Sequence, residues 1–313
     1  MAEERYIVEK TIDRRLVYII IGASIVLALG VSTFFLLNVR SHKLTLLDRA
    51  VSVNDFDNAI YLFNELYRTN PLDKNIIKSG IALHYARMRY ATNEDARYTS
   101  AEKAVSFVRQ MMLIDWRLTR DPKAYAILGR AYEFRGQTFF DDAIECYERA
   151  VALGDTSVDT RVRTGVLCYT QGRFGNAVTH WEYAFDRVRE GKSEIRITDD
   201  VRYLLGHAYA GASNYGKAID YFTGLAQSTI DASYTSYIHA DLGLWCFRQG
   251  LYPESEYHFK TALSLDDKNP RTYYNMAFLY KKMNRIGDAR RALERSLWID
   301  KKFLEAEIAL KRL

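Results

Sequence analysis

A spaced pattern of side chains repeats along most of this 313-residue chain. In each copy a small residue is followed four positions later by a bulky one, and in most copies by another small residue three positions after that. Steps of three, four and seven positions place side chains on one face of a helix. The leading small residues lie 34 to 45 residues apart, at Ala59, Ala104, Ala143, Ala177, Ala218, Ser255 and Ala289. The pattern predicts an all-α fold in which one helical element recurs about seven times.

A second pattern precedes most copies of the first by twelve residues. Its clear cases are Leu128-Gly129 with Tyr132, Leu205-Gly206 with Tyr209, and Leu242-Gly243 with Cys246. Turn residues such as Gly250 and Asn284 separate the two patterns, and Gly and Asn tolerate the left-handed backbone that ends a helix. Each copy therefore predicts two short helices joined by a tight turn.

Residues 41–313 resemble the tetratricopeptide repeat (TPR) family, whose unit is 34 residues long. The stretch YIHADLGLWCFRQGLYPESEYHFKTALSLD, from Tyr237 to Asp266, matches most of the family signature, and the next unit follows at the family period. The resemblance implies a right-handed α-solenoid of about seven hairpins, with a concave groove lined by the first helix of each pair. It divides the chain into degenerate units at 41–120, a regular array at 121–303 and a capping helix at 304–313.

Three segments depart from the regular unit. We expect Ala91–Ser100 to form an expanded loop and Arg189–Asp200 to form a polar surface loop. In the capping helix we expect Leu304, Ile308 and Leu313 to face the last hairpin, because an end repeat must cover its own apolar face.

The stretch Leu16–Val39 carries no charged residue. Twenty-four residues at about 1.5 Å per residue span about 36 Å, which is enough for a hydrocarbon core of about 30 Å. A cleaved signal peptide and a buried core helix are the alternatives, although the apolar part of a signal peptide is normally only about 7–15 residues long. We therefore predict a transmembrane helix at 16–39.

Basic residues beside this stretch give a weak indication of its orientation. Four precede it and three follow it, namely Arg5, Lys10, Arg14 and Arg15, then Arg40, Lys43 and Arg49. This slight excess predicts that residues 1–15 stay in the cytoplasm. In a bacterium, the chain would then be a single-pass inner-membrane protein with its repeats in the periplasm.

The sequence offers no recognisable catalytic, cofactor or metal site. It has no Gly-rich phosphate loop, nucleophile elbow or His-Glu-x-x-His pair. Its six histidines fall in different units without paired spacing, and its three cysteines are not at metal-ligand spacing. With 44 basic residues against 39 acidic ones, the charge is too mixed to indicate nucleic-acid binding. We expect a protein that is not an enzyme and has no small-molecule substrate.

The family resemblance places partner contacts on exposed positions of the first helices. By alignment these are Lys123, Arg130, Tyr203, His207, Tyr237, Phe247, Arg248, Tyr274, Phe278, Lys281 and Lys282. Aromatic and basic side chains together suit a protein segment with apolar and acidic residues; the alternative is that some of the rings pack between hairpins. The clamp by which chaperone-binding relatives hold a terminal carboxylate needs Lys and Asn where this chain has Ala240 and Leu244, so that specialisation is not expected.

These features predict a membrane-anchored scaffold that binds protein partners and assembles or stabilises a multiprotein membrane complex. A bacterial flagellar motor is one such complex. One alternative is a client-binding receptor or chaperone-like adaptor that uses the groove. Another is a regulatory subunit of an envelope enzyme. A basic cluster over the last sixty residues is interleaved with acidic residues, which is typical of a solvated helix face.

Overall fold

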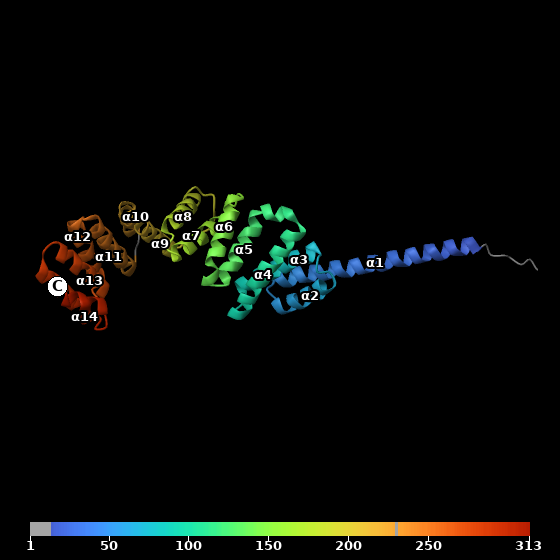
Figure 1. The fold of residues 1–313 in the computed structure, drawn as a ribbon, viewed down its shortest axis with the longest axis horizontal. Coiled ribbons are helices and arrows are strands. Elements are labelled where there is room, and N and C mark those ends of the chain that lie inside the picture. The colour runs from blue at the N-terminus through green and yellow to red at the C-terminus, as the bar shows by residue number, and fades with distance from the viewer. Residues whose placement is uncertain (1–13, 229–230) are drawn as a thin grey trace, which may run out of the picture. The chain divides into compact units, whose positions relative to one another are not determined.

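A computed structural model describes residues 14–228 and 231–313, and over these ranges every regular element is a helix (Figure 1). The predicted all-α repeat fold is confirmed. Residues 1–13, which make up most of the expected cytoplasmic segment, lie outside the described residues. The chain divides into two compact units, Met1–Leu153 and Gly154–Leu313, and each is described separately.

The first unit contains three helical hairpins among its described residues. Its α-helices are α1 (Arg14–Ser52), α2 (Phe56–Thr69), α3 (Lys74–Tyr90), α4 (Glu94–Ile114), α5 (Pro122–Phe134) and α6 (Phe140–Ala152). Two short 3-10 helices, η1 (Trp116–Arg120) and η2 (Gln137–Phe139), lie in the connections before α5 and α6. The connection that contains η2 is two residues longer than in later hairpins, since Gly129 precedes Ala143 by fourteen residues and Gly206 precedes Ala218 by twelve.

Helix α1 is continuous from the apolar stretch into the first hairpin. It is 39 residues long, and its apolar part projects beyond α2 and α3 with its described side chains exposed (Figure 1). Residues Ile21–Ser52 form a helix long and apolar enough to cross a membrane, a property that a signal sequence near the amino terminus can share. The carboxyl-terminal end of α1 is different, because Leu47 and Ala50 are buried against α2 and α3.

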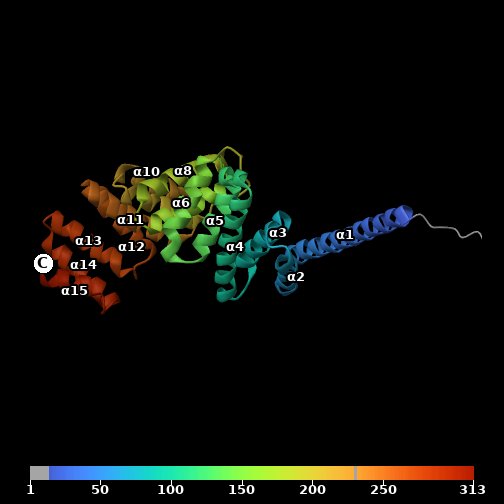
Figure 2. The same cartoon turned by 45° about the vertical axis from the view of Figure 1, so that its right-hand side comes forward.

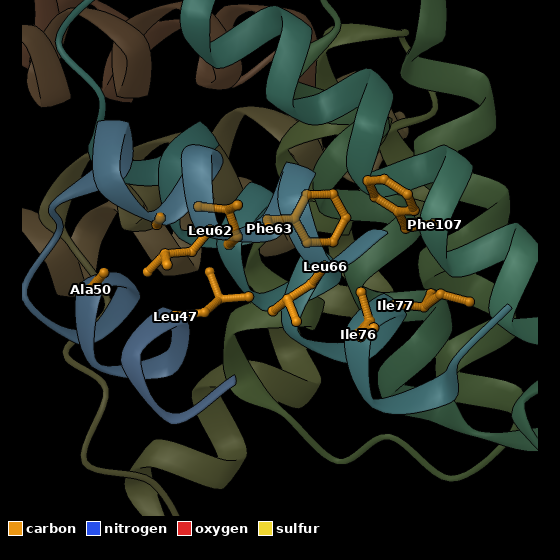
Figure 3. Close-up of a cluster of buried hydrophobic side chains, with 10 residues drawn as sticks. Leu47, Ala50, Leu62, Phe63, Leu66, Ile76, Ile77 and Phe107 are labelled. Carbon is orange, nitrogen blue, oxygen red and sulfur yellow. The ribbon is translucent and has the colours of Figure 1, made fainter. Parts of the chain in front are cut away.

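The core of the first unit gathers around Phe63 of α2. Leu47 of α1, Ile76 and Ile77 of α3 and Phe107 of α4 are buried in the same cluster (Figure 3). The rings of Phe63 and Phe107 meet edge to face with their centroids 5.2 Å apart, a favourable arrangement for two aromatic rings. Burial of these side chains holds the end of α1 to the hairpins that follow it.

The expected expanded loop at Ala91–Ser100 is wrong, since α4 begins at Glu94. The Asn93 side chain caps this helix by accepting hydrogen bonds from the backbone N–H groups of Asp95 (2.8 Å) and Ala96 (3.4 Å). Glu94 and Asp95 then place negative charge in the first turn, where it favours a helix. The polar residues that suggested a loop are therefore a helix start.

The described residues of the second unit form four hairpins and a final short helix, which is labelled α15 in Figure 2. The helices are α7 (Val158–Thr170), α8 (Phe174–Arg189), α9 (Asp199–Gly211), α10 (Tyr215–Ser228), α11 (Ala232–Gln249), α12 (Tyr252–Leu265), α13 (Pro270–Lys282), α14 (Ile286–Ile299) and α15 (Leu304–Lys311). Tight turns join the helices of each hairpin, and Gly250, Ser213 and Asn284 have positive φ there. The non-helical segment between α8 and α9 confirms the loop expected near Arg189–Asp200, although Ile197 within it is buried.

In the hairpins α7–α8, α9–α10 and α11–α12 of the second unit, an aromatic ring of the second helix covers a glycine of the first. A Cβ atom on Gly243 of α11 would lie 2.6 Å from the Phe259 ring of α12. Such a distance is too short for a carbon–carbon contact, so the ring fits only because the side chain is missing. The Leu-Gly pattern in the sequence therefore marks the point at which the two helices approach most closely.

Helix α15 covers the last hairpin, but not with all of the expected side chains. Ala306 is fully buried, and Ala309, Leu310 and Leu313 pack against the core of α13 and α14. Leu304 is 60% exposed and does not face the hairpin, so that expectation is wrong. The helix presents its small residues to its neighbours because they allow close approach.

Candidate partner-binding site

The residues expected to contact a partner lie on the first helices of four hairpins. One hairpin is in the first unit, where α5 carries Lys123 and Arg130. The others are in the second unit, where α9, α11 and α13 carry Tyr203, His207, Tyr237, Phe247, Arg248, Tyr274, Phe278, Lys281 and Lys282. Their burial and contacts differ widely, so they do not form one uniform surface.

In the first unit the two residues have different environments. Lys123 is exposed at the start of α5. Arg130 is mostly covered, with its side chain 13% exposed and its guanidinium over the Phe134 ring at 5.1 Å. Its Nη1 lies 3.8 Å from Glu133 Oε2. Arg130 is thus largely engaged within its own helix, and Lys123 is the more accessible of the two.

On α9 and α11 a carboxylate joins two of the expected residues. The Tyr203 hydroxyl donates a hydrogen bond to Asp241, and His207 Nε2 lies 3.0 Å from Asp241 Oδ2. The two rings meet at a centroid distance of 4.6 Å. Burial, together with the adjacent Asp241 carboxylate, raises the pKa of Tyr203 above its usual value, so its hydroxyl keeps its proton. These groups already use one another as partners.

Trp245 of α11 extends this aromatic cluster. Its ring meets His207 edge to face at 5.7 Å and stacks on Tyr215 at 6.0 Å. Its buried Nε1–H has no hydrogen-bond partner among the described residues. Sequence reasoning missed Asp241 and Trp245. The only available signal was their position on either side of Leu242-Gly243, next to the glycine at which the helices of this hairpin meet.

Three expected residues of α13 line one hollow. A cavity of about 300 Å³ is bordered on one side by Tyr274, Phe278 and Lys281. On the other side it is bordered by Ile308 of α15 and by Arg312, which follows that helix. Lys281 Nζ reaches the carbonyl oxygen of Arg312 at 3.4 Å. The apolar floor of the cavity is completed by Ala277, Leu293, Ala309 and Leu313. At the rim, Glu305 lies with the cations Lys281 and Arg312. The hollow can take an apolar side chain with a negative group beside it.

Two segments of the chain match family models for the tetratricopeptide repeat, residues 128–192 and residues 258–291. Residues 128–192 include two contacts of a glycine with an aromatic ring, Gly129 with Tyr147 and Gly165 with Trp181. The chain carries tetratricopeptide repeats.

Two solved structures resemble the chain with TM-scores above 0.5. One is the C-terminal part of a TPR repeat-containing protein from Cytophaga hutchinsonii, with a TM-score of 0.55 and 18% identity; the match covers 85% of this chain and 99% of that one. The other is Naa15/Naa10 bound to HypK-THB, with a TM-score of 0.58 and 14% identity, covering 87% of this chain and 38% of that one. At these identities the similarity shows the fold alone.

A curated relative from Triticum aestivum is the Hsp70-Hsp90 organizing protein. The alignment is 195 residues long with 20% identity, and it covers 52% of this chain. The match spans only 33% of the relative's own length.

The remaining expected residues of the TPR array stand apart from the hollow. Tyr237, Arg248 and Lys282 are exposed. Phe247 is half-buried and packs against Tyr252 at a centroid distance of 6.1 Å, within the core of the last hairpins. Sequence reasoning also missed the contribution of α15, because its residues were interpreted only as a cap.

The two helices of one TPR hairpin bring together a pair of histidines. His239 of α11 and His258 of α12 stack, and their Nδ1 atoms lie 3.1 Å apart. Burial and the neighbouring His239 lower the pKa of His258 to about 4, and burial lowers that of His239. At neutral pH both rings are therefore uncharged and one can donate to the other. The expectation that no histidines are paired is wrong, because positions 19 residues apart meet across the turn.

Proposed function

We propose that this chain is a membrane-anchored scaffold that holds other proteins on the first helices of its repeats. The observation that carries the proposal is the hollow beside α13, where an apolar floor opens under the cations Lys281 and Arg312. Phe278 at the edge of the hollow is 39% exposed, so a partner could contact its ring. Clustered aromatic and basic side chains are typical of protein-binding hot spots.

The same chemistry defines the partner segment. An apolar side chain would enter the hollow and an acidic residue beside it would meet Lys281 and Arg312, since opposite charges at an interface favour the correct register. Tyr237, Arg248 and Lys282 offer further exposed positions on the first helices of the last hairpins, and Lys123 offers one in the first unit. Tyr274 lines the hollow itself. Tyr203, His207 and Phe247 are engaged by other side chains of the second unit, and Arg130 is engaged within its own helix.

The form of α1 supports membrane attachment. Its apolar part is exposed along its described length and continues without a break into the first hairpin. A helix of this kind would place the first repeats beside the bilayer. The proposed topology has the amino terminus in the cytoplasm and the repeats in the periplasm, following the excess of basic residues before residue 16. Protease digestion of spheroplasts tests it: cleavage of the repeats is expected, and their full protection would contradict this orientation.

A pair of variants tests the scaffold. Phe278→Asp places a charge in the hollow and should remove partners that co-purify with the full chain in mild detergent. Trp298→Asp is a matched control, because Trp298 is an exposed aromatic residue on α14 outside the hollow. Loss of the same partners in both variants would contradict a specific role for the hollow. A wild-type chain that elutes as a free monomer would contradict the scaffold itself.

A client-binding adaptor is the second candidate, and the name of the wheat relative favours it. A carboxylate clamp of the chaperone-binding type has no support, since Leu244 packs against the core of the last hairpins. An adaptor would release its partners on a short timescale, whereas a scaffold would retain them through purification. A place in a flagellar motor, or as a subunit of an envelope enzyme, rests on architecture alone.

A further inference from the structure

A groove lies between α1 and α2 at the point where the apolar part of α1 ends. It has a volume of about 690 Å³. Leu36, Leu37 and Val39 form part of its wall, and the cations beside them are Arg40, Lys43 and Arg68. We call it the α1–α2 groove. It contains none of the residues of the proposed partner surface.

The path of the chain fixes the level of this groove along α1. Helix α2 runs back along α1, so its last residues, Thr69 and Asn70, line the same groove as Leu36 and Leu37. Arg40 forms an ion pair with Asp73 at the start of α3. The turn between α2 and α3 is therefore held beside the last turn of the apolar stretch.

The length of the apolar stretch shows what surrounds this level in a membrane. The twenty residues from Leu16 to Phe35 already span about 30 Å as a helix, the thickness of a hydrocarbon core. Leu36–Val39 then reach the boundary with the lipid headgroups. The α1–α2 groove thus has an apolar wall facing the acyl chains and cations at the level of the phosphates.

The charges in the groove are not balanced internally. Lys43 Nζ pairs with Glu65 Oε2 at 2.9 Å, and Arg40 pairs with Asp73. Arg68 has no ion-pair partner among the described residues. It lies near the end of α2, beside the apolar wall. An anion seated in the groove would complement this remaining positive charge.

Exposed apolar side chains lie close to the same turn. Leu72 within the turn is 70% exposed, and Trp116 after α4 is 64% exposed. The end of α4 is tied to the turn, since Gln110 Nε2 donates to the carbonyl oxygen of Pro71 at 2.9 Å and Lys74 pairs with Asp115 at 3.1 Å. Tryptophan is enriched where a membrane meets water. These residues are consistent with a surface that faces lipid.

We propose that the α1–α2 groove binds an anionic phospholipid of the bilayer that α1 crosses. Arg68 contacts the phosphate, and Arg40 and Lys43 add positive charge beside it. The part of the acyl chains nearest the headgroup lies along Leu36, Leu37 and Val39. The lipid fills the space between the anchor and the first repeat. The proposal rests on the membrane attachment of α1 but is independent of the partner surface.

The test uses the full chain reconstituted in vesicles of phosphatidylglycerol and phosphatidylcholine in equal amounts. After extraction in mild detergent, the phospholipids that remain bound are measured by native mass spectrometry. The wild-type chain should retain phosphatidylglycerol in preference. Arg68→Gln should lower that preference about fivefold, the effect of one basic residue near an anionic surface, while Arg68→Lys should keep most of it. Arg49→Gln is the matched control, because Arg49 is an exposed cation nine residues beyond Arg40 on the same helix.

The outcomes separate the two levels of the proposal. If alkaline carbonate strips the wild-type chain from the vesicles, α1 does not anchor it and the proposed function fails first. If the chain stays inserted but Arg68→Gln retains as much phosphatidylglycerol as wild type, the groove is not the lipid site. Equal losses in Arg68→Gln and Arg49→Gln would show diffuse attraction between the basic face and the vesicle, which also overturns it.

Discussion

The amino-terminal and carboxy-terminal hairpins use the same pair of residue types for different purposes. In the carboxy-terminal hairpin of α11 and α12, Phe259 covers Gly243 of its own hairpin. In the first unit, Phe63 of α2 covers Gly80 of α3, and α3 belongs to the next hairpin; a Cβ on Gly80 would lie 2.4 Å from the ring. The contact that closes a hairpin in one region therefore joins two hairpins in the other.

Leu47 of α1 stands sixteen residues before Phe63, whereas Gly243 stands sixteen residues before Phe259. Helix α1 therefore has no glycine at this position to make room for the ring, and Phe63 meets the glycine of α3 instead. Phe63 stacks with Tyr67 and meets His84 of α3 and Phe107 of α4, which binds three helices into one core. The carboxy-terminal repeats are more local, as in repeat arrays whose stability sums over neighbouring contacts. We expect helices α2, α3 and α4 to unfold as a larger cooperative block.

Replacing the central ring in each region should give the largest effect. Phe63→Ala and Phe259→Ala both empty a fully enclosed site, and each should cost about 3–5 kcal/mol. Hydrogen exchange of the full chain in detergent should show lost protection throughout α2, α3 and α4 for Phe63→Ala. For Phe259→Ala the loss should centre on α11, α12 and the start of α13. Identical local losses in both variants would remove the proposed difference.

Adding a methyl group to the close contacts should give the next largest effect. Gly80→Ala and Gly243→Ala force an aromatic ring to move, at about 1–3 kcal/mol each. Gly80→Ala should loosen α3 from α2, and Gly243→Ala should loosen α11 from α12, as read from hydrogen exchange. Gly224→Ala is the control: nothing lies within 4 Å of its Cβ position in α10, so better helix propensity should stabilise it by up to about 1 kcal/mol. If Gly224→Ala were destabilised instead, the losses in Gly80→Ala and Gly243→Ala could not be assigned to crowding against an aromatic ring.

The sequence was most informative where contacts are local. The Leu-Gly and small-aromatic spacings predicted the hairpins of the array because a glycine and its ring lie in one repeating unit, as Gly206 and Phe222 do. The pairing of Gly80 with Phe63 breaks that spacing, and only the three-dimensional path shows it. The start of α4 was missed for another reason, since a cap such as Asn93 and a loop use the same polar residues.

The helices that carry the candidate partner residues were predicted from the sequence, but the contacts of these residues were not. Alignment placed Tyr203 and Tyr274 on the correct helices, yet it could not show that Tyr203 is engaged by Asp241 from another hairpin. It also could not place α15 over α13, where Ile308 and Arg312 complete the hollow. Contacts between segments far apart in sequence leave no periodic signal.

Acidification should affect the two regions through different histidines. Burial, then Arg87 and Lys103, lowers the pKa of His84 in the amino-terminal core to about 4. The folded state therefore holds His84 neutral, whereas in the unfolded chain it binds a proton near pH 6.5. Its full contribution is present above pH 6.5 and is lost as the pH falls from 6.5 towards 4. Between pH 7 and pH 5 the loss should be about 1–2 kcal/mol.

Matched variants separate the histidines of the two regions. His84→Leu should flatten the pH dependence of hydrogen exchange in α3 and α4 and leave that of α11 and α12 unchanged. His258→Leu should do the reverse, because burial also lowers the pKa of His258 to about 4. If His84→Leu left the amino-terminal pH dependence intact, the buried imidazole would not be its cause.

The smallest effects are expected at the helix caps, where contact with α1 gives one of two similar caps a second interaction. Asp73 caps α3 by accepting from the backbone N–H groups of Asn75 (2.9 Å) and Ile76 (3.2 Å), and Asn269 caps α13 in the same way. Asn269→Ala should therefore cost about 1 kcal/mol, the usual value of a cap. Asp73 also forms the ion pair with Arg40 of α1, so Asp73→Ala should cost more.

Asparagine at position 73 distinguishes the two roles of this residue. Asp73→Asn keeps a capping oxygen and removes the charge that Arg40 meets, so it should retain α3 but release the turn from α1. The expected change is at most about 1 kcal/mol, because the pair is partly exposed. Hydrogen exchange should then increase in the turn before α3 while α3 itself stays protected. If α3 lost as much protection as in Asp73→Ala, the charge of Asp73 would act through the cap of α3 and not through the ion pair with Arg40 of α1. The cap of α3 would then serve the same single role as the cap of α13.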